Sequence, residues 1–203
     1  MNQDLFQLGI KELVRCDRDL AGVVEQLGHP NRWQREPGFP TLIQIILEQQ
    51  VSLASAKATF DRLKENVQEL TPESFLSLND TELKAMGFSR QKTRYGRELS
   101  QAIFNDRLDL DRLESLSNQE VRQTLTAIKG IGDWTVDMYL MMALKRLDVF
   151  PSKDLAVAVA VRKIKNLPTR PKKAELESIA EQWRPYRAIA TQILWHYYLN
   201  SKR

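Results

Sequence analysis

Two glycines on either side of one isoleucine, Gly130 and Gly132, mark a segment whose backbone groups could do chemistry. Glycine permits a positive φ and a tight turn between helices, and it leaves the backbone open to close approach. The residues after the turn should begin a helix, whose first N–H groups and dipole favour an anion such as a phosphate. Ile128 and Ile131 would pack between the helices and hold the turn. Taken alone, the pattern equally fits an ordinary glycine-rich helix–helix turn.

A carboxylate follows in the stretch Asp148-Val149-Phe150-Pro151-Ser152-Lys153-Asp154-Leu155. Asp154 precedes an apolar run and is therefore a candidate N-cap, and most aspartates in such a position are only caps. A carboxylate held in this way could also stabilise a developing positive charge or position a water molecule. The residue types by themselves leave both roles open.

The elements that must position these groups have helical spacing. Apolar periodicity and capping signals predict helices at 4–27 (one or two), 42–50, 53–69, from Thr71-Pro72, 80–86, 89–104 and 118–127. Thr41 is expected to cap the helix 42–50, and Pro171 and Pro185 are expected in the first turns of the two final helices. The segment 134–144 is apolar almost all round, which predicts a central buried helix.

The segment 155–161 alternates between leucine or valine and alanine, a pattern that by itself favours a strand. Both alternating sets are apolar, so no solvent-facing side is defined. A buried helix capped by Ser152 or Asp154 agrees better with a chain that shows no other strand. We therefore predict an all-α fold.

Composition narrows the class of protein. The chain has 203 residues, a formal net charge of +4 and 28% charged residues, which is compatible with a polyanionic partner without requiring one. The single cysteine, Cys16, excludes a disulfide framework and any iron–sulfur cluster or zinc site built from several cysteines. With no apolar run of membrane-spanning length and no signal-peptide pattern, we expect no membrane partner. The expected compartment is the cytoplasm in a bacterium and the nucleus in a eukaryote.

Four motifs, in order, resemble the helix-hairpin-helix DNA glycosylases and within them the 3-methyladenine (alkylpurine) DNA glycosylase II branch. They are residues 39–52, residues 130–135 with 148–155, residues 183–187, and Trp195 at the spacing of that branch. The resemblance runs from about residue 30 to residue 200. It implies two helical lobes with DNA bound across a cleft. Lobe A would comprise about 36–145, including the hairpin 125–135, and lobe B 1–35 with 146–203. We expect the compact form without an N-terminal sheet domain, acting as a monomer.

The resemblance also assigns a reaction, the hydrolysis of the N-glycosidic bond of alkylated purines in double-stranded DNA. It makes Asp154 the catalytic carboxylate and places Trp134 and Trp195 in the base pocket, with Met138 where some relatives have an aromatic residue. Trp134 stands where relatives that also cut the backbone carry a Schiff-base lysine, so no lyase activity is expected. The pattern departs after Asp154, because the basic residues Arg162-Lys163 come later than is usual.

DNA contacts are implied for two segments, the end of the helix 42–50 and the hairpin. They involve Gln49, Gln50, Ile128, Lys129, Gly130, Ile131, Gly132 and Asp133, with Gln50 filling the gap that the extruded base leaves. Without the resemblance, the two glutamines would be an exposed helix C-terminus. A structural Na or K ion is implied at the backbone carbonyls of Ile128 and Gly130. No cofactor is expected to be required.

Several alternatives stay open. A glycosylase for other damaged bases could use the same scaffold, and a non-catalytic DNA-binding protein could use the hairpin for phosphate contact alone. A helical interaction protein would make every motif a matter of packing. The basic stretch 89–97 is interpreted as a solvated face, with a second DNA contact as the alternative.

Overall fold

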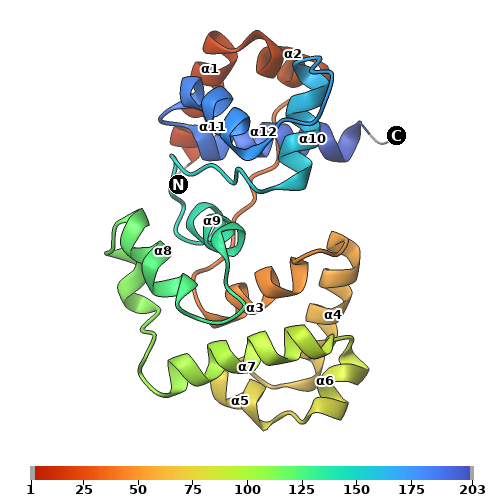
Figure 1. Ribbon diagram of the computed structural model, residues 1–203, viewed down its shortest axis with the longest axis vertical. Helices are drawn as coiled ribbons and strands as arrows, with labels where there is room; N and C mark the ends of the chain where they lie inside the picture. Colours follow the sequence, from red (N-terminus) through yellow and green to blue (C-terminus); the bar gives the residue numbers. More distant parts are fainter. Residues whose placement is uncertain (1–2, 202–203) are drawn as a thin grey trace. The chain divides into compact units, whose positions relative to one another are not determined.

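The computed structural model describes residues 3–201, and within that range all regular structure is helical (Figure 1). The predicted all-α fold is confirmed. The α-helices are α1 Gln3–Cys16, α2 Arg18–Leu27, α3 Phe39–Glu48, α4 Leu53–Asn66, α5 Pro72–Ser77, α6 Asp80–Met86, α7 Arg90–Phe104, α8 Asn118–Thr126, α9 Asp133–Met142, α10 Leu155–Ile164, α11 Lys173–Ala180 and α12 Arg187–Asn200, with short 3-10 turns η1 Asp111–Glu114 and η2 Glu181–Trp183.

These helices form two compact units. Unit 1 consists of Met1–Gln34 with Leu140–Arg203, and unit 2 consists of Arg35–Tyr139. The chain therefore returns to unit 1 inside α9, whereas the sequence analysis drew this boundary near residue 145. No helix among residues 3–201 is long and apolar enough to cross a membrane.

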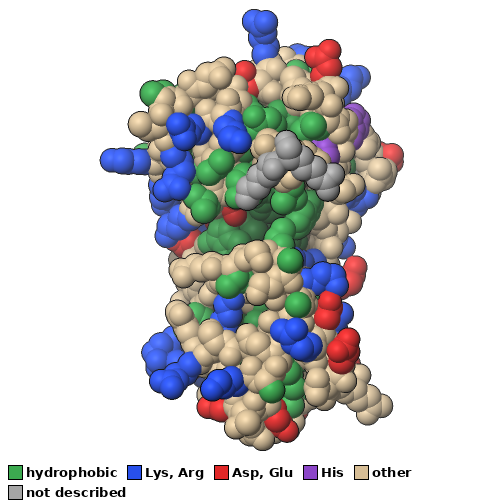
Figure 2. Space-filling view, turned by 90° about the vertical axis from the view of Figure 1, so that its right-hand side faces the viewer, with side chains coloured by type: hydrophobic (Ala, Val, Ile, Leu, Met, Phe, Trp, Pro, Cys, Tyr) green, Lys and Arg blue, Asp and Glu red, His purple; other side chains and the backbone are tan. Residues whose placement is uncertain are grey.

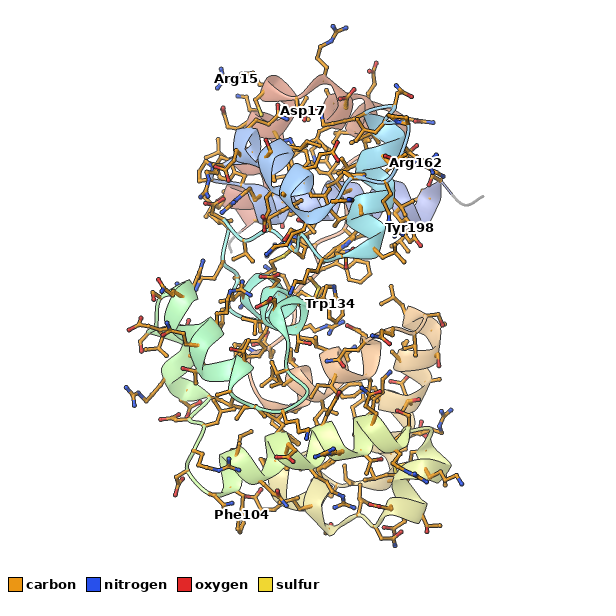
Figure 3. The ribbon with its side chains drawn as sticks, in the orientation of Figure 1. Arg15, Asp17, Phe104, Trp134, Arg162 and Tyr198 are labelled. Atoms are coloured by element: carbon orange, nitrogen blue, oxygen red, sulfur yellow. The ribbon has the colours of Figure 1, made fainter. Side chains whose placement is uncertain are left out.

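Unit 1 is built around α12, which packs against α1, α2 and α10. The helix is buried from Ala188 to Trp195. The junction between α1 and α2 is fixed by Asp17, which caps α2 and accepts hydrogen bonds from the Trp183 indole (2.8 Å) and from the Lys165 ammonium (3.0 Å). Figure 3 shows Asp17 at this junction. A buried carboxylate with an ammonium and an indole as donors satisfies the requirement that buried charges be paired.

Unit 2 is built around α3, which packs against α4 and α7. The helix α5 also packs against α7. The side chains of Phe39, Phe75 and Phe88 form successive ring contacts at 5.7–6.1 Å between centroids. The predicted buried helix after the hairpin is confirmed, because α9 is buried without interruption from Thr135 to its end. This burial includes the carboxylate of Asp137, which pairs with Arg122 of α8.

Local capping explains where most helices begin. Thr71 caps α5 with Pro72 in the first turn, as the sequence predicts. The predicted cap at Thr41 is wrong: α3 begins at Phe39, and the Thr41 hydroxyl donates instead to the Glu36 carbonyl at 2.6 Å. Pro171 and Pro185 each precede the N-cap of their helix instead of lying in its first turn.

The alternating segment after Asp154 is the helix α10, as predicted against its strand-like pattern. Its buried residues are Val157, Ala158, Ala160 and Val161, which follow helical and not alternating spacing. Leu155 is exposed. Packing against α12 therefore selects the helical face that the sequence alone could not define.

Candidate functional site

Asp154 is held in a fixed orientation in unit 1. Its Oδ1 accepts a hydrogen bond from the Val157 backbone N–H (2.9 Å) and one from the Trp195 indole Nε1 (3.3 Å). The residue is only 8% exposed. The Asp154 carboxylate therefore caps α10, as the sequence predicts, and also accepts a hydrogen bond from Trp195. A carboxylate aimed by two donors can stabilise a positive charge that develops beside it.

The turn that carries Asp154 is anchored to the start of α12. The Asp148 carboxylate accepts hydrogen bonds from Arg187 Nε (2.6 Å) and Arg184 Nη1 (2.7 Å). The Ala188 backbone N–H donates to the Leu147 carbonyl at 2.9 Å. Phe150 packs edge-on against Trp183 with 5.7 Å between ring centroids. Because α12 also carries Trp195, these contacts fix both partners of the Asp154–Trp195 bond to one helix.

A second tryptophan, Trp33, extends this cluster, and the sequence analysis missed it. Its ring lies 5.6 Å from that of Trp195, tilted by 56°, and its backbone N–H donates to the buried Gln192 side chain at 3.0 Å. Trp195 is 6% exposed, whereas Trp33 is partly exposed. Trp33 lies between α2 and α3, where no periodicity or motif singles it out. Only its distance to α12 identifies it.

The surface of unit 1 agrees with an apolar site. On the face that Figure 2 shows, hydrophobic side chains gather on the unit that holds α1, α2 and α10–α12. Lys and Arg side chains border this area on one side. Small-molecule sites are lined mainly by hydrophobic and aromatic side chains with a few polar groups.

The hairpin lies in unit 2, and its two glycines differ in role. Gly130 has a φ of +98°, and a Cβ at this position would overlap the ring of Tyr95. Gly132 has nothing within 4 Å of a Cβ position and is exposed at the start of α9. Ile128 and Ile131 are buried, as predicted, and Lys129 is exposed. Gly130 is therefore required by the turn, while Gly132 leaves the helix terminus open to a ligand.

Gln49 and Gln50 follow α3 and have different surroundings: the Gln49 side chain bonds within the protein, and Gln50 is exposed. The Gln49 side-chain amide donates to the Gly130 carbonyl and to the Thr135 hydroxyl, both at 2.9 Å. Gln50 is exposed and has a φ of +56°, a left-handed conformation that is uncommon for a residue with a side chain. The neighbouring Val51 and Leu53 are exposed apolar residues.

The hairpin carbonyls have the right chemistry for a monovalent ion, because oxygen ligands suit hard cations. The Ile128 carbonyl accepts a hydrogen bond from the Ile131 N–H at 3.1 Å, which leaves it a second lone pair. The Gly130 carbonyl accepts the Gln49 amide. Each of the two carbonyls therefore keeps a second lone pair beside the hydrogen bond that it accepts. Residues 3–201 hold no cluster of three or more His, Cys, Asp or Glu side chains suited to a metal ion.

The remaining predicted pocket residues belong to α9 in unit 2. Trp134, labelled in Figure 3, lies in the first turn and is partly exposed, and Met138 follows one turn later with 2% exposure. Residues four apart lie on the same face of a helix. Asp133, in the same first turn, forms an ion pair of 3.4 Å with Arg122.

The basic stretch 89–97 divides into two groups. Lys92 donates to the Leu47 carbonyl, and Arg97 donates to the Leu78 carbonyl at 2.8 Å and to Asp80. Burial lowers the pKa of Lys92, and the nearby Glu48 carboxylate opposes that shift. Arg90 and Arg94 are exposed. Lys92 and Arg97 therefore stabilise unit 2, whereas Arg90 and Arg94 face solvent and could contact a phosphate.

The geometry agrees with comparisons to known proteins. Residues 43–185 match the family model described as HhH-GPD superfamily base excision DNA repair protein. DNA-3-methyladenine glycosylase 1 of Schizosaccharomyces pombe is 33% identical over 88% of this chain and 82% of its own length.

Two solved structures are similar over nearly the whole chain. One is the Schizosaccharomyces pombe 3-methyladenine DNA glycosylase Mag1 in complex with abasic DNA, with a TM-score of 0.86 and 31% identity over 92% of this chain and 94% of that one. The other is a DNA-3-methyladenine glycosidase from Bacillus halodurans, with a TM-score of 0.79 and 30% identity over 96% and 90%. The chain therefore belongs to the HhH-GPD superfamily of base excision DNA repair proteins.

Proposed function

We propose that this chain hydrolyses the N-glycosidic bond of alkylated purines in double-stranded DNA and leaves an abasic site. The observation that carries this proposal is the Asp154 carboxylate, aimed by the Val157 N–H and the Trp195 indole. Relatives named for 3-methyladenine support the substrate class, and a similar enzyme bound to abasic DNA supports the product.

The reaction needs a base outside the helix, because a stacked base is inaccessible in duplex DNA. As the C1′–N bond breaks, its electron pair leaves with the purine and neutralises the positive charge of the alkylated ring. The sugar then carries the positive charge, which Asp154 stabilises. A water oxygen bonds to C1′ and loses its proton to solvent. Alkylated purines are good leaving groups, so the site needs no second acid and no cofactor.

Aromatic rings provide the recognition in this proposal. A positively charged purine is attracted to the face of a tryptophan more strongly than a neutral one. Trp195 is nearly buried, and its indole donates a hydrogen bond to Asp154. In this proposal it orients the carboxylate and packs against the ring of Trp33. Trp33 is partly exposed beside it and offers a ring face. By resemblance, Trp134 and Met138 of α9 are further candidates for contact with the base.

DNA is held by the hairpin and by the residues after α3. The first N–H groups of α9, next to the open Gly132, would bind a backbone phosphate. The backbone carbonyls of Ile128 and Gly130 would hold a Na or K ion, whose charge would attract that phosphate. Gln50 would fill the space of the extruded base.

The proposal is tested by incubating the protein with randomly methylated duplex DNA and separating the released bases by chromatography. We expect 3-methyladenine or 7-methylguanine from the wild type and none from Asp154→Asn. Asparagine is as good an N-cap as aspartate, so this variant keeps the cap of α10 and its DNA affinity. Excision at the wild-type rate by Asp154→Asn would remove Asp154 from the mechanism.

Lyase chemistry is tested separately. Trp134 stands at the position of the Schiff-base lysine of bifunctional relatives, and Lys129 and Lys153 lie elsewhere. We therefore expect no covalent adduct with DNA after borohydride treatment, with a bifunctional glycosylase as the positive control. An adduct that disappears in Lys153→Arg would assign a nucleophile to that lysine.

A further inference from the structure

We propose that Gln49 is a positioning residue, whose amide fixes the hairpin (residues 125–135) to the end of α3 so that the hairpin can hold a DNA phosphate. The inference rests on DNA as the partner and not on which base is removed. It assigns Gln49 a role within the protein, where the sequence suggested a contact with DNA.

The amide reaches both sides of the turn. Gly130 lies in the turn itself, and Thr135 lies in the first turn of α9, and Gln49 Nε2 is 2.9 Å from an acceptor on each. Thr135 is 1% exposed, so this contact is shielded from water. A terminal glutamine would normally be solvated, and bonds of this kind cost side-chain freedom. The two acceptors thus hold the turn and the helix start in one fixed relation.

The two residues before Gln49, Leu47 and Glu48, are each held by a contact with another part of unit 2. The Leu47 carbonyl accepts a hydrogen bond from Lys92 of α7. Glu48 forms an ion pair of 2.5 Å with Arg35, and the two side chains are only 8% and 14% exposed. A buried bidentate pair of this kind is geometrically specific. The last turn of α3 therefore provides a rigid base for the Gln49 side chain.

The opposite side of the hairpin is fixed by α7. The ring of Tyr95 fills the space that a Cβ at Gly130 would need, and the Gln91 amide donates to the Tyr95 hydroxyl at 2.6 Å. Gly130 is thus held by Tyr95 packing and by a hydrogen bond from Gln49. Since the bond to the Gly130 carbonyl polarises the same peptide group that donates to Ile128, it also strengthens the turn.

The consequence concerns binding more than folding. Backbone N–H groups bind a phosphate only when they point at it together, and small displacements abolish that geometry. Without the Gln49 amide, the hairpin keeps its buried isoleucines Ile128 and Ile131 but loses the bond that fixes its orientation. DNA affinity should therefore fall while the fold persists.

The test measures the affinity of the full chain for undamaged duplex DNA at several salt concentrations, together with thermal unfolding. Gln49→Met keeps the length of the side chain and removes its donor, and Gln49→Glu places a carboxylate against the Gly130 carbonyl. We expect both to weaken binding by roughly 10-fold and to reduce the slope of log affinity against log salt by about one phosphate contact. Thr135→Ser, which keeps the acceptor, should bind like the wild type.

The matched controls are Gln101→Met and Gln101→Glu on the exposed surface of α7. They make the same changes away from the hairpin, and we expect their affinities to stay within about twofold of the wild type. Wild-type affinity and salt slope in Gln49→Met would overturn the proposal. So would a loss in Gln49→Met that the Gln101→Met control shares. Failure of the proposed function is seen separately, as a wild-type protein that binds DNA but releases no base.

Discussion

The indole Nε1 of Trp195 donates a hydrogen bond to Oδ1 of Asp154 across 41 residues of sequence. This bond gives a tryptophan of the predicted base pocket a second purpose, the orientation of the carboxylate. Trp195→Phe keeps a six-membered aromatic ring beside Trp33 and removes the N–H donor together with the rest of the indole. Since a hydrogen bond to a charged group contributes about 1.5–3 kcal/mol, we expect base release to slow by roughly 10-fold or more. Single-turnover rates measure this, and an unchanged rate would leave Val157 as the relevant donor.

Trp33 should determine how strongly the protein prefers cationic purines. Trp33→Leu removes the aromatic face, and we expect the rate of 7-methylguanine release to fall by roughly 10-fold, because cation–π attraction contributes up to about 2 kcal/mol in a desolvated site. Trp33→Phe should retain most of the activity. The control substrate is hypoxanthine, a neutral base. An equal loss for both bases in Trp33→Leu would indicate a packing role instead of charge recognition.

The two hairpin glycines should fail in different ways. Gly130→Ala must adopt a φ of +98° and displace Tyr95, so we expect a loss of unfolding free energy of about 1–3 kcal/mol. Gly132→Ala meets open space and should keep wild-type stability, while its methyl group stands where a phosphate would approach. We expect roughly 10-fold weaker DNA binding from Gly132→Ala, equivalent to about 1.4 kcal/mol.

Chemical denaturation and DNA titration of both variants separate these effects. A Tyr95→Ala background serves as the control for the clash, because it removes the ring that an alanine at 130 would meet. The double variant should recover part of the lost stability. If Gly132→Ala proved the less stable of the two single variants, the assignment of roles would be reversed.

Acid should destabilise unit 1 through Asp17. Burial raises the pKa of this carboxyl, but the hydrogen bonds and charge of Trp183 and Lys165 outweigh it, and the net pKa is lowered. A lowered folded-state pKa contributes stability that is fully present above the unfolded value, about 3.9, and is lost as pH falls through the folded-state value. We therefore expect unfolding free energy to decrease below about pH 4.

The ion pairs of Lys165 with Asp17 and Asp19 should also make the unfolding free energy fall at alkaline pH. Burial lowers the pKa of Lys165, yet its bonds to Asp19 and Asp17 outweigh this and raise the net pKa. Its contribution is complete below the unfolded value, about 10.4, and disappears as pH rises through the folded-state value. Asp17→Asn should flatten the acid limb and weaken the alkaline one. An acid limb of unchanged steepness in Asp17→Asn would place the pH dependence on other carboxylates.

Local chemistry in the sequence was sufficient for much of the fold. Helical spacing predicted the helices, Thr71-Pro72 predicted a cap, and Gly130 predicted the turn, because each depends on residues within one or two turns of the chain. The start of α3 was predicted incorrectly: the helix begins at Phe39, and the Thr41 hydroxyl donates to the Glu36 carbonyl five residues earlier instead of capping. The family resemblance, carried by spaced motifs, agrees with the superfamily match.

Tertiary structure decided the partners of these residues. Asp154 was a cap candidate by sequence, but its bond to Trp195 arises only when α10 packs on α12. Trp33 has no sequence signal, and Gln49 was assigned to DNA because its bond to Gly130 spans 81 residues. The physical reason is one of distance along the chain. The hydrogen bonds of caps and turns join residues a few positions apart, whereas the long-range partners of a side chain depend on which helices pack together. The sequence by itself thus determined the helices and the candidate carboxylate, and the packing of the two units, each within itself, decided what holds that carboxylate and the hairpin in place.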